Sequence, residues 1–141
     1  MSMENIFGIA GSAINAQMVR LNLTASNIAN AGTTASSAAE TYKGKKALFQ
    51  TILETQKNVA ANQFAGGVKV DKIVELDTPG PRLYEPGHPQ ADQDGYLHKS
   101  NVNEVTEMVE MMAASRSFQN NVEVVNTARE LMIRTIDSIK S

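Results

Sequence analysis

Residues 102–140 read VNEVTEMVEMMAASRSFQNNVEVVNTARELMIRTIDSIK. Mostly apolar residues recur in this stretch at steps of three and four, which is the spacing of one side of an α-helix. A second apolar stripe runs beside the first, so the pattern predicts one long helix with apolar residues on more than one side. The first stripe is Met108, Met111, Ser115, Phe118, Val122, Val125, Arg129, Met132, Ile136 and Ile139. The second is Val105, Val109, Met112, Val124 and Leu131.

The ends of this predicted helix carry suitable polar residues. Asn101 and Glu104 have the spacing of a capping box. The first turns are acidic and the last turns are basic, which complements the helix dipole. At 1.5 Å per residue the helix would be roughly 55–60 Å long. The acidic residues at the start are Glu104, Glu107 and Glu110, and the basic residues toward the end are Arg129, Arg134 and Lys140.

Residues 3–30 predict a second, shorter helix, roughly 40 Å long. Only Glu4 and Arg20 are charged in this stretch, so it can lie beside several neighbours without like-charge repulsion. We expect it to end near Gly32, because glycine suits the left-handed cap of a helix. Its heptad stripe is Phe7, Gly11, Ile14, Met18, Leu21, Ala25 and Ile28.

The two helices could form nothing more than the core of an antiparallel hairpin. However, the longer helix outreaches its partner, and one helix cannot cover apolar stripes on more than one side. Long exposed stripes mark association surfaces. We therefore expect both helices to contact each other and further subunits. The expected interface residues are Phe7, Ile14, Met18, Leu21, Ala25, Ile28, Met108, Met111, Met112, Phe118, Val122, Val125, Met132, Ile136 and Ile139.

The chain between the helices has a different composition. Residues 31–40 form a linker rich in Ser, Thr, Ala and Gly, and residues 77–100 contain all four prolines. Residues 68–76 alternate as a strand, while residues 46–53 fit either a strand or a short helix. We favour a two-stranded hairpin for this pair.

The expected fold class is therefore mainly α. Long N- and C-terminal helices pair as a coiled-coil-like hairpin, with a small β-hairpin and an extended Pro/Gly-rich segment between them. In terms of domains, residues 1–34 and 101–141 would form a discontinuous core, and residues 35–100 would form the linker, hairpin and extended segment.

Composition excludes several classes of function. The net charge is −2, which offers no electrostatic basis for binding nucleic acid. Cysteine is absent, which removes disulfides and thiol chemistry. No apolar run approaches the length of a membrane span, and no cleavable signal peptide is visible at the N-terminus.

One cluster has residue types that bind metals: His88, Asp92, Asp94 and His98. These residues lie in a segment rich in proline and glycine, and Asp94 followed by Gly95 is an ordinary turn signal. A zinc hydrolase would need a rigid frame around its ligands. We therefore expect no catalytic, cofactor-binding or metal-binding residues, and no enzyme, with a small metal-dependent hydrolase as the alternative.

Two terminal segments resemble one protein family. Residues 16–34 read AQMVRLNLTASNIANAGTT and are similar to the signature of flagellar rod and hook proteins. Near the other end, residues 101–103 (NVN), 107–109 (EMV) and 112–127 (MAASRSFQNNVEVVNT) resemble the C-terminal helix of that family.

The middle of the chain indicates which branch of this family the sequence resembles. Residues 67–70 (GVKV), 84–89 (YEPGHP) and 92–96 (DQDGY) look like those of proximal-rod members. Another axial protein of the rod and hook family is the nearest alternative, and a cytoplasmic helical adaptor is a more distant one.

The resemblance implies a structural subunit of the bacterial flagellar basal body. Such a subunit is exported by the flagellar type III apparatus without a cleaved signal, and it polymerises through its terminal helices into the periplasmic rod. The rod transmits torque and encloses the export channel. The implied partners are other rod proteins, the rod-base adaptor, the membrane-embedded ring and export apparatus, and copies of the chain itself.

Overall fold

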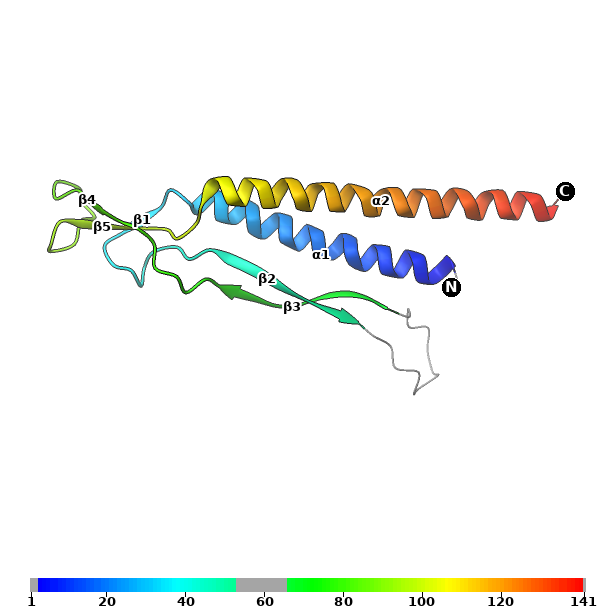
Figure 1. Cartoon of the computed structure of the whole chain (residues 1–141), viewed down its shortest axis with the longest axis horizontal. Helices are drawn as coiled ribbons and strands as arrows, with labels where there is room; N and C mark the ends of the chain where they lie inside the picture. The colour runs from blue at the N-terminus through cyan, green and yellow to red at the C-terminus, as the bar shows by residue number, and fades with distance from the viewer. Residues whose placement is uncertain (1–2, 53–65, 141) are drawn as a thin grey trace.

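The fold is described from a computed structural model, which covers residues 3–52 and 66–140. The chain has a long helix at each end and short strands between them in sequence, as expected (Figure 1). The elements are α1 (Met3–Asn30), β1 (Thr34–Ala35), β2 (Lys45–Ile52), β3 (Gly67–Glu75), β4 (Arg82–Tyr84), β5 (Tyr96–Lys99) and α2 (Glu104–Lys140).

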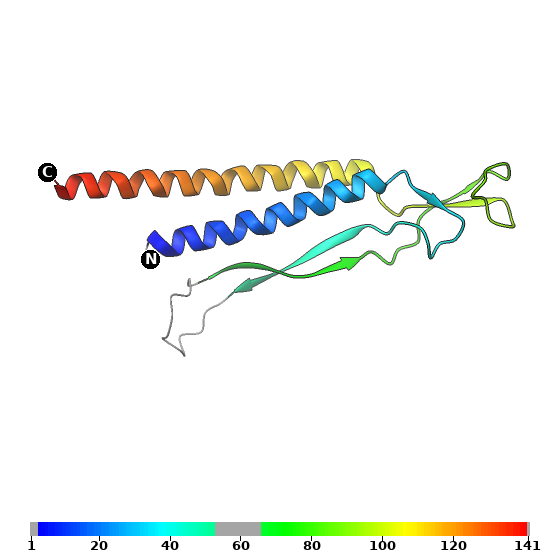
Figure 2. The ribbon, with the colours of Figure 1, turned by 180° about the vertical axis from the view of Figure 1, so that it is seen from behind.

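The helix α1 forms the central layer of the long part of the molecule. It runs antiparallel to α2 on one side and contacts β2 and β3 on the other (Figures 1 and 2). The strands β2 and β3 pair antiparallel, from Lys45 opposite Glu75 to Ile52 opposite Gly67. The hairpin expectation is therefore confirmed over the described residues, and Leu53 lies outside them.

A second, three-stranded sheet lies at the end of the molecule away from both termini (Figure 1). Its strand order is β1-β5-β4, with antiparallel pairing throughout. The central strand β5 carries Leu97, which is only 2% exposed and opposes Leu83 of β4. The segment containing the prolines is thus partly strand, organised around one buried leucine.

The N-terminal cap of α2 differs from the expected one. The cap is Asn103, whose Oδ1 accepts a hydrogen bond from the Thr106 amide at 3.1 Å. Asn101 instead joins other segments: it accepts from the Gly44 amide and donates to the carbonyl oxygens of Leu76 and Thr78. The predicted capping box of Asn101 and Glu104 is therefore wrong, because the Asn101 side chain is bonded to backbone groups of other segments.

The C-terminal end of α1 also differs in detail. The helix ends at Asn30, as expected, but Gly32 is not among the glycines with positive φ. The last carbonyl groups are satisfied in another way: the amides of Ala31 and Thr33 donate three residues back, and the Thr33 hydroxyl donates to the Asn30 carbonyl. These bonds make a left-handed glycine cap unnecessary.

The buried apolar core is made mostly of small side chains. Besides Leu97, every buried hydrophobic residue in the described parts of the chain is an alanine: Ala10, Ala16, Ala31, Ala114 and Ala128. Alanine lets the helix backbones approach closely but leaves little large apolar surface inside the subunit. In the portions that the structure covers, no helix is long and apolar enough to cross a membrane.

Candidate assembly surface

A buried polar cluster joins α1, α2 and β2. The Asn27 side-chain amide donates to the Glu107 carboxylate and to the Lys45 carbonyl, each at 2.9 Å. Its Oδ1 accepts from the Lys45 amide at 2.9 Å and from the Tyr42 hydroxyl at 3.0 Å. Asn27 is 1% exposed and Glu107 is 5% exposed. This cluster holds three elements together and so determines which faces of the helices remain uncovered.

The predicted stripe on α1 is only partly buried. Its members Phe7, Ile14, Leu21 and Ile28 are half-buried, whereas Met18 and Ala25 are exposed. The residues that α1 buries fully are Ala10, Ala16, Thr24 and Asn27. The larger apolar side chains therefore lie beside the most buried line of the helix and keep part of their surface open.

The predicted interface residues on α2 divide in the same way. The half-buried ones are Met111, Phe118, Val122, Val125 and Met132. The exposed ones are Met108, Met112, Ile136 and Ile139. The fully buried residues of α2 are Glu107, Ala114 and Ala128, which fall at steps of three and four with the half-buried Met111, Phe118, Val122 and Val125. That spacing is the one expected of a helix packed along one side.

The first turns of α2 carry an apolar patch away from the buried line. Val105, Met108, Val109 and Met112 are all more than half exposed, and Val105 reaches 72%. Glu104 begins the same helix and is also exposed. We call these four apolar residues the proximal patch.

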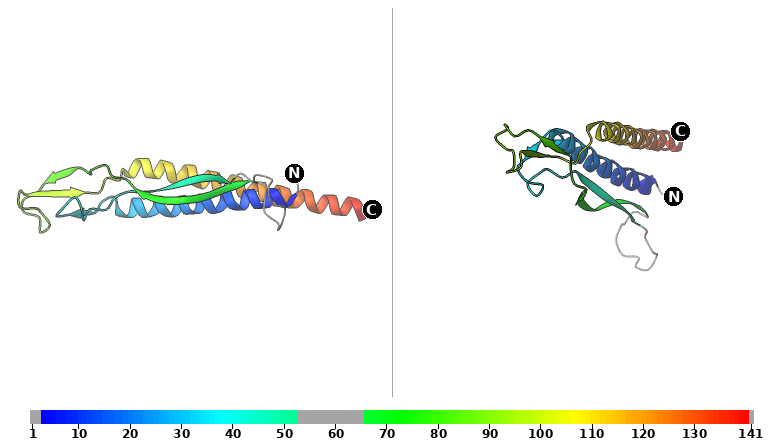
Figure 3. Two further views of the ribbon diagram at one scale, coloured as in Figure 1. Left: turned by 90° about the horizontal axis from the view of Figure 1, so that it is seen from below. Right: turned by 60° about the vertical axis from the view of Figure 1, so that its left-hand side comes forward.

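The far end of α2 forms a second apolar surface. The helix α2 has 37 residues and α1 has 28, and the C-terminal turns of α2 extend past the start of α1 (Figures 1 and 3). These turns carry Leu131, Ile133, Ile136 and Ile139, of which Ile139 is 78% exposed. We call these four residues the overhang. Single exposed apolar residues are common on proteins, but two clusters on one helix indicate contact surfaces.

The hairpin adds further exposed apolar side chains. Leu48, Phe49, Ile52 and Ile73 are all between a third and just over half exposed. The Arg20 guanidinium of α1 lies 6.0 Å from the centre of the Phe49 ring, within reach of a cation–π interaction. The hairpin is thus attached to α1 on one side and leaves part of its apolar surface available.

The cluster with metal-binding residue types forms a turn. Asp92 Oδ1 accepts from the amides of Tyr96 at 2.8 Å and Asp94 at 3.0 Å, and its other oxygen lies 3.5 Å from His98 Nε2. The Tyr96 bond is the largest cause that lowers the pKa of Asp92. His88 Nδ1 accepts from the Gln90 amide. Among residues 3–52 and 66–140, no three His, Cys, Asp or Glu side chains are grouped to hold a metal ion.

Two family models match the ends of the chain. The model described as "Flagella basal body rod protein" matches residues 7–35. The model described as "Flagellar basal body rod FlgEFG protein C-terminal" matches residues 93–138. These ranges contain most of α1 and α2, the two helices that carry the apolar surfaces.

Curated relatives match nearly the whole length. The flagellar basal-body rod protein FlgC of Salmonella typhimurium is 45% identical over 136 residues, covering 96% of this chain and 97% of the relative. The chain belongs to the FlgC family of flagellar basal-body rod proteins. The FlgC of Escherichia coli O157:H7 is 46% identical with the same coverage. The FlgC of Bacillus subtilis is 31% identical over 139 residues, covering 92% of this chain and 93% of the relative.

Membership of the FlgC family confirms the resemblance seen in the sequence. It places the chain in the flagellar basal body and identifies it as a structural rod protein. The sequence did not predict the polar contacts of Asn27, Tyr42 and Glu107, which connect elements inside the subunit. In the sequence these residues are visible only as polar side chains next to the apolar stripes, and that position does not indicate which residues pair.

Proposed function

We propose that this FlgC-family chain is a subunit of the proximal rod that polymerises through its terminal helices. The rod is the tubular drive shaft that transmits torque and encloses the export channel. The observation that carries this proposal is the uncovered apolar surface of α2 at both ends, the proximal patch and the overhang. Burying apolar surface contributes about 25 cal/mol per Å² before the costs of association, so both surfaces favour contact with neighbours.

The pairing of α1 and α2 is, in this proposal, coiled-coil-like and continues between subunits. The support is the alternation of three and four residues among the buried and half-buried positions of α2. Residues 1–34 and 101–141 would then act as one discontinuous core domain, and residues 35–100 would pack around it. In this proposal the predicted interface residues serve two kinds of contact. Those half-buried in the subunit would pack between its own α1 and α2, and the exposed ones would contact neighbouring subunits.

The proposed partners are neighbours in the basal body. They comprise other rod proteins, the rod-base adaptor, the membrane-embedded ring, the export apparatus and copies of this chain. The chain would reach the periplasmic space through the flagellar type III apparatus, without cleavage of a signal peptide. A subunit in this position would contact neighbours that differ from one another. The methionines of α2 suit such contacts, because the flexible thioether side chain adapts to unlike surfaces.

We further propose that the chain is not an enzyme. The support is the ordinary role of its histidines and aspartates: Asp92 closes a turn and His88 accepts a backbone bond. No observation on the described residues favours the metal-dependent hydrolase. Membership of the FlgC family favours the proximal rod over other axial proteins.

Fractionation of cells tests this proposal. We expect the chain to copurify with intact basal bodies and to be absent from basal bodies of a strain in which rod assembly is blocked. Recovery of the chain only as a free cytoplasmic protein, in cells with complete basal bodies, would contradict it.

A further inference from the structure

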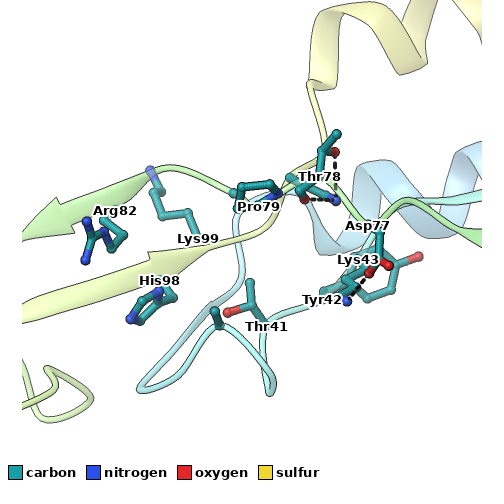
Figure 4. Close-up of a pocket in the computed structure, with 12 residues that line it drawn as sticks. Thr41, Tyr42, Lys43, Asp77, Thr78, Pro79, Arg82, His98 and Lys99 are labelled. Carbon is teal, nitrogen blue, oxygen red and sulfur yellow. Dashed lines mark hydrogen bonds and ion pairs between the residues drawn. The ribbon is translucent and has the colours of Figure 1, made fainter.

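A cavity of about 530 Å³ lies between the linker, the segment after β3 and the strands β4 and β5. Figure 4 shows Arg82 and His98 at one end of this cavity and the pair of Lys43 and Asp77 at the other. The wall also includes Ala38, Pro79, Gly80 and Lys99. The cavity thus combines small apolar groups with cations at both ends, and neither terminal helix forms its wall.

The Lys43 ammonium and the Arg82 guanidinium, at opposite ends of the cavity, are not equivalent. Lys43 Nζ lies 2.7 Å from the carboxylate of Asp77, so its charge is already paired. His98 lies 3.5 Å from Asp92. Arg82 is exposed, and within residues 3–52 and 66–140 no carboxylate forms an ion pair with it. Its guanidinium lies 5.5 Å from the centre of the Tyr96 ring, which helps to orient a planar group whose donors remain available.

An aromatic row continues from Arg82 along the same face of the sheet. Arg82 opposes His98 and Tyr84 opposes Tyr96, and alternate residues of a strand share a face. The ring centroids of Tyr84 and Tyr96 are 5.1 Å apart, and Tyr84 is 61% exposed. Tyrosine and arginine are enriched at the energetic centres of protein interfaces. The cavity therefore opens beside a face suited to binding a protein chain.

We infer that this cavity and the adjoining face bind an extended acidic segment of another basal-body protein, with a carboxylate of that segment paired to Arg82. This inference rests on the proposed function, which supplies the partner. A planar guanidinium forms two parallel hydrogen bonds with a carboxylate. A cavity of this size is in the range of sites for larger ligands, and a lone inorganic anion would leave its apolar wall uncovered. Arg82 and Lys99 both line the cavity, and within residues 3–52 and 66–140 neither forms an ion pair, so the unpaired charge of the cavity is positive and favours an anionic ligand.

Titration of the isotopically labelled chain with blocked tetraglutamate peptide, followed by NMR, tests the inference. We expect saturable changes at the amides of Thr78, Arg82 and Lys99, and none with tetraglutamine. Arg82→Gln should weaken binding by at least about tenfold, because a charge-assisted pair is lost. Lys72→Gln removes an exposed cation from the hairpin and should leave binding unchanged. No saturable change, equal binding by inorganic phosphate, or unchanged binding by Arg82→Gln would each overturn the inference.

A second measurement separates this inference from the proposed function. Arg82→Glu should lower recovery of the chain in basal bodies, whereas Lys72→Glu should not, with both variants equally folded by circular dichroism. Normal recovery of Arg82→Glu would overturn the acidic-segment inference while leaving the rod function intact. Absence of the wild-type chain from basal bodies would instead contradict the proposed function.

Discussion

The Asn27 side chain donates to the Glu107 carboxylate across 80 residues of sequence, and both residues are almost fully buried. The same amide group also bonds the backbone of Lys45. A buried carboxylate is costly unless hydrogen bonds compensate its lost hydration. This pair therefore fixes α1, α2 and β2 relative to one another where alanine packing alone would allow them to slide.

Asn27→Ala should destabilise the isolated subunit by more than about 2 kcal/mol, because Glu107 and the Lys45 backbone would lose their partner inside the protein. Chemical denaturation followed by helical circular dichroism measures the change. The matched control is Asn30→Ala, three residues along, where the side-chain amide makes a solvent-exposed hydrogen bond to the Ser26 carbonyl within the same helix. Equal destabilisation by the two variants would show that the buried network has no special role.

Ala114→Leu should also destabilise the subunit, by about 1–3 kcal/mol, because Ala114 is fully buried and extra methylene groups would force the helices apart. Ala113→Leu provides the comparison, since the neighbouring side chain is exposed. It should change the free energy of unfolding by less than about 0.5 kcal/mol. Thermal unfolding of both variants decides whether α1 packs closely at this point, and a harmless Ala114→Leu would contradict that packing.

The turn held by Asp92 should loosen in acid. Hydrogen bonds from the Tyr96 and Asp94 amides favour the ionised carboxylate and lower the pKa of Asp92 from its ordinary value of 3.8. Because the folded pKa is the lower one, the stabilisation is complete above that ordinary value and is lost as pH falls through the folded pKa. We expect the Tyr96 amide to lose exchange protection in this acidic range.

Asp92→Asn keeps an oxygen acceptor but removes the titration. Protection of the Tyr96 amide in this variant should therefore no longer vary over the same acidic range. Asp94→Asn, which leaves the acceptor Asp92 intact, should behave as wild type. An unchanged acid response in Asp92→Asn would assign the loosening to another group.

Ile136→Asp should separate folding from assembly. Ile136 lies on the overhang, where α2 extends past α1, so a carboxylate there stays hydrated in the isolated subunit (Figure 3). The free energy of unfolding should change by less than about 0.5 kcal/mol. In an assembled rod the same carboxylate would be buried without a partner and should prevent incorporation. Gln119→Asp adds the same charge at an exposed polar position of α2 and should assemble normally.

The terminal helices could be predicted because their apolar spacing persists over many turns. The predicted ends at Met3, Asn30 and Lys140 agree with the structure, and the start of α2 at Glu104 lies two residues inside the expected range. Apolar spacing alone did not identify the fully buried residues of either helix. Those residues are alanine, threonine, asparagine and glutamate, which a search for large apolar residues passes over.

Long-range polar contacts could not be predicted from local patterns. Asn101 and Asn103 are equally good capping residues by type, and only the position of Gly44 in the fold determines that Asn101 bonds elsewhere. Gly32 likewise had the right residue type for a helix cap but not the conformation. The cavity beside Arg82 needs three segments that the sequence separates by tens of residues, so no motif marks it.

Labelling of single engineered cysteines tests the central claim most directly, because the natural chain contains no cysteine. Val109→Cys in the proximal patch and Ile136→Cys in the overhang should react rapidly with a maleimide in the isolated subunit, since both positions are exposed there. In purified basal bodies, both should be protected by at least about tenfold, because neighbouring subunits cover apolar interface surface. Equal labelling of both cysteines in the free and assembled states would contradict assembly through these helices.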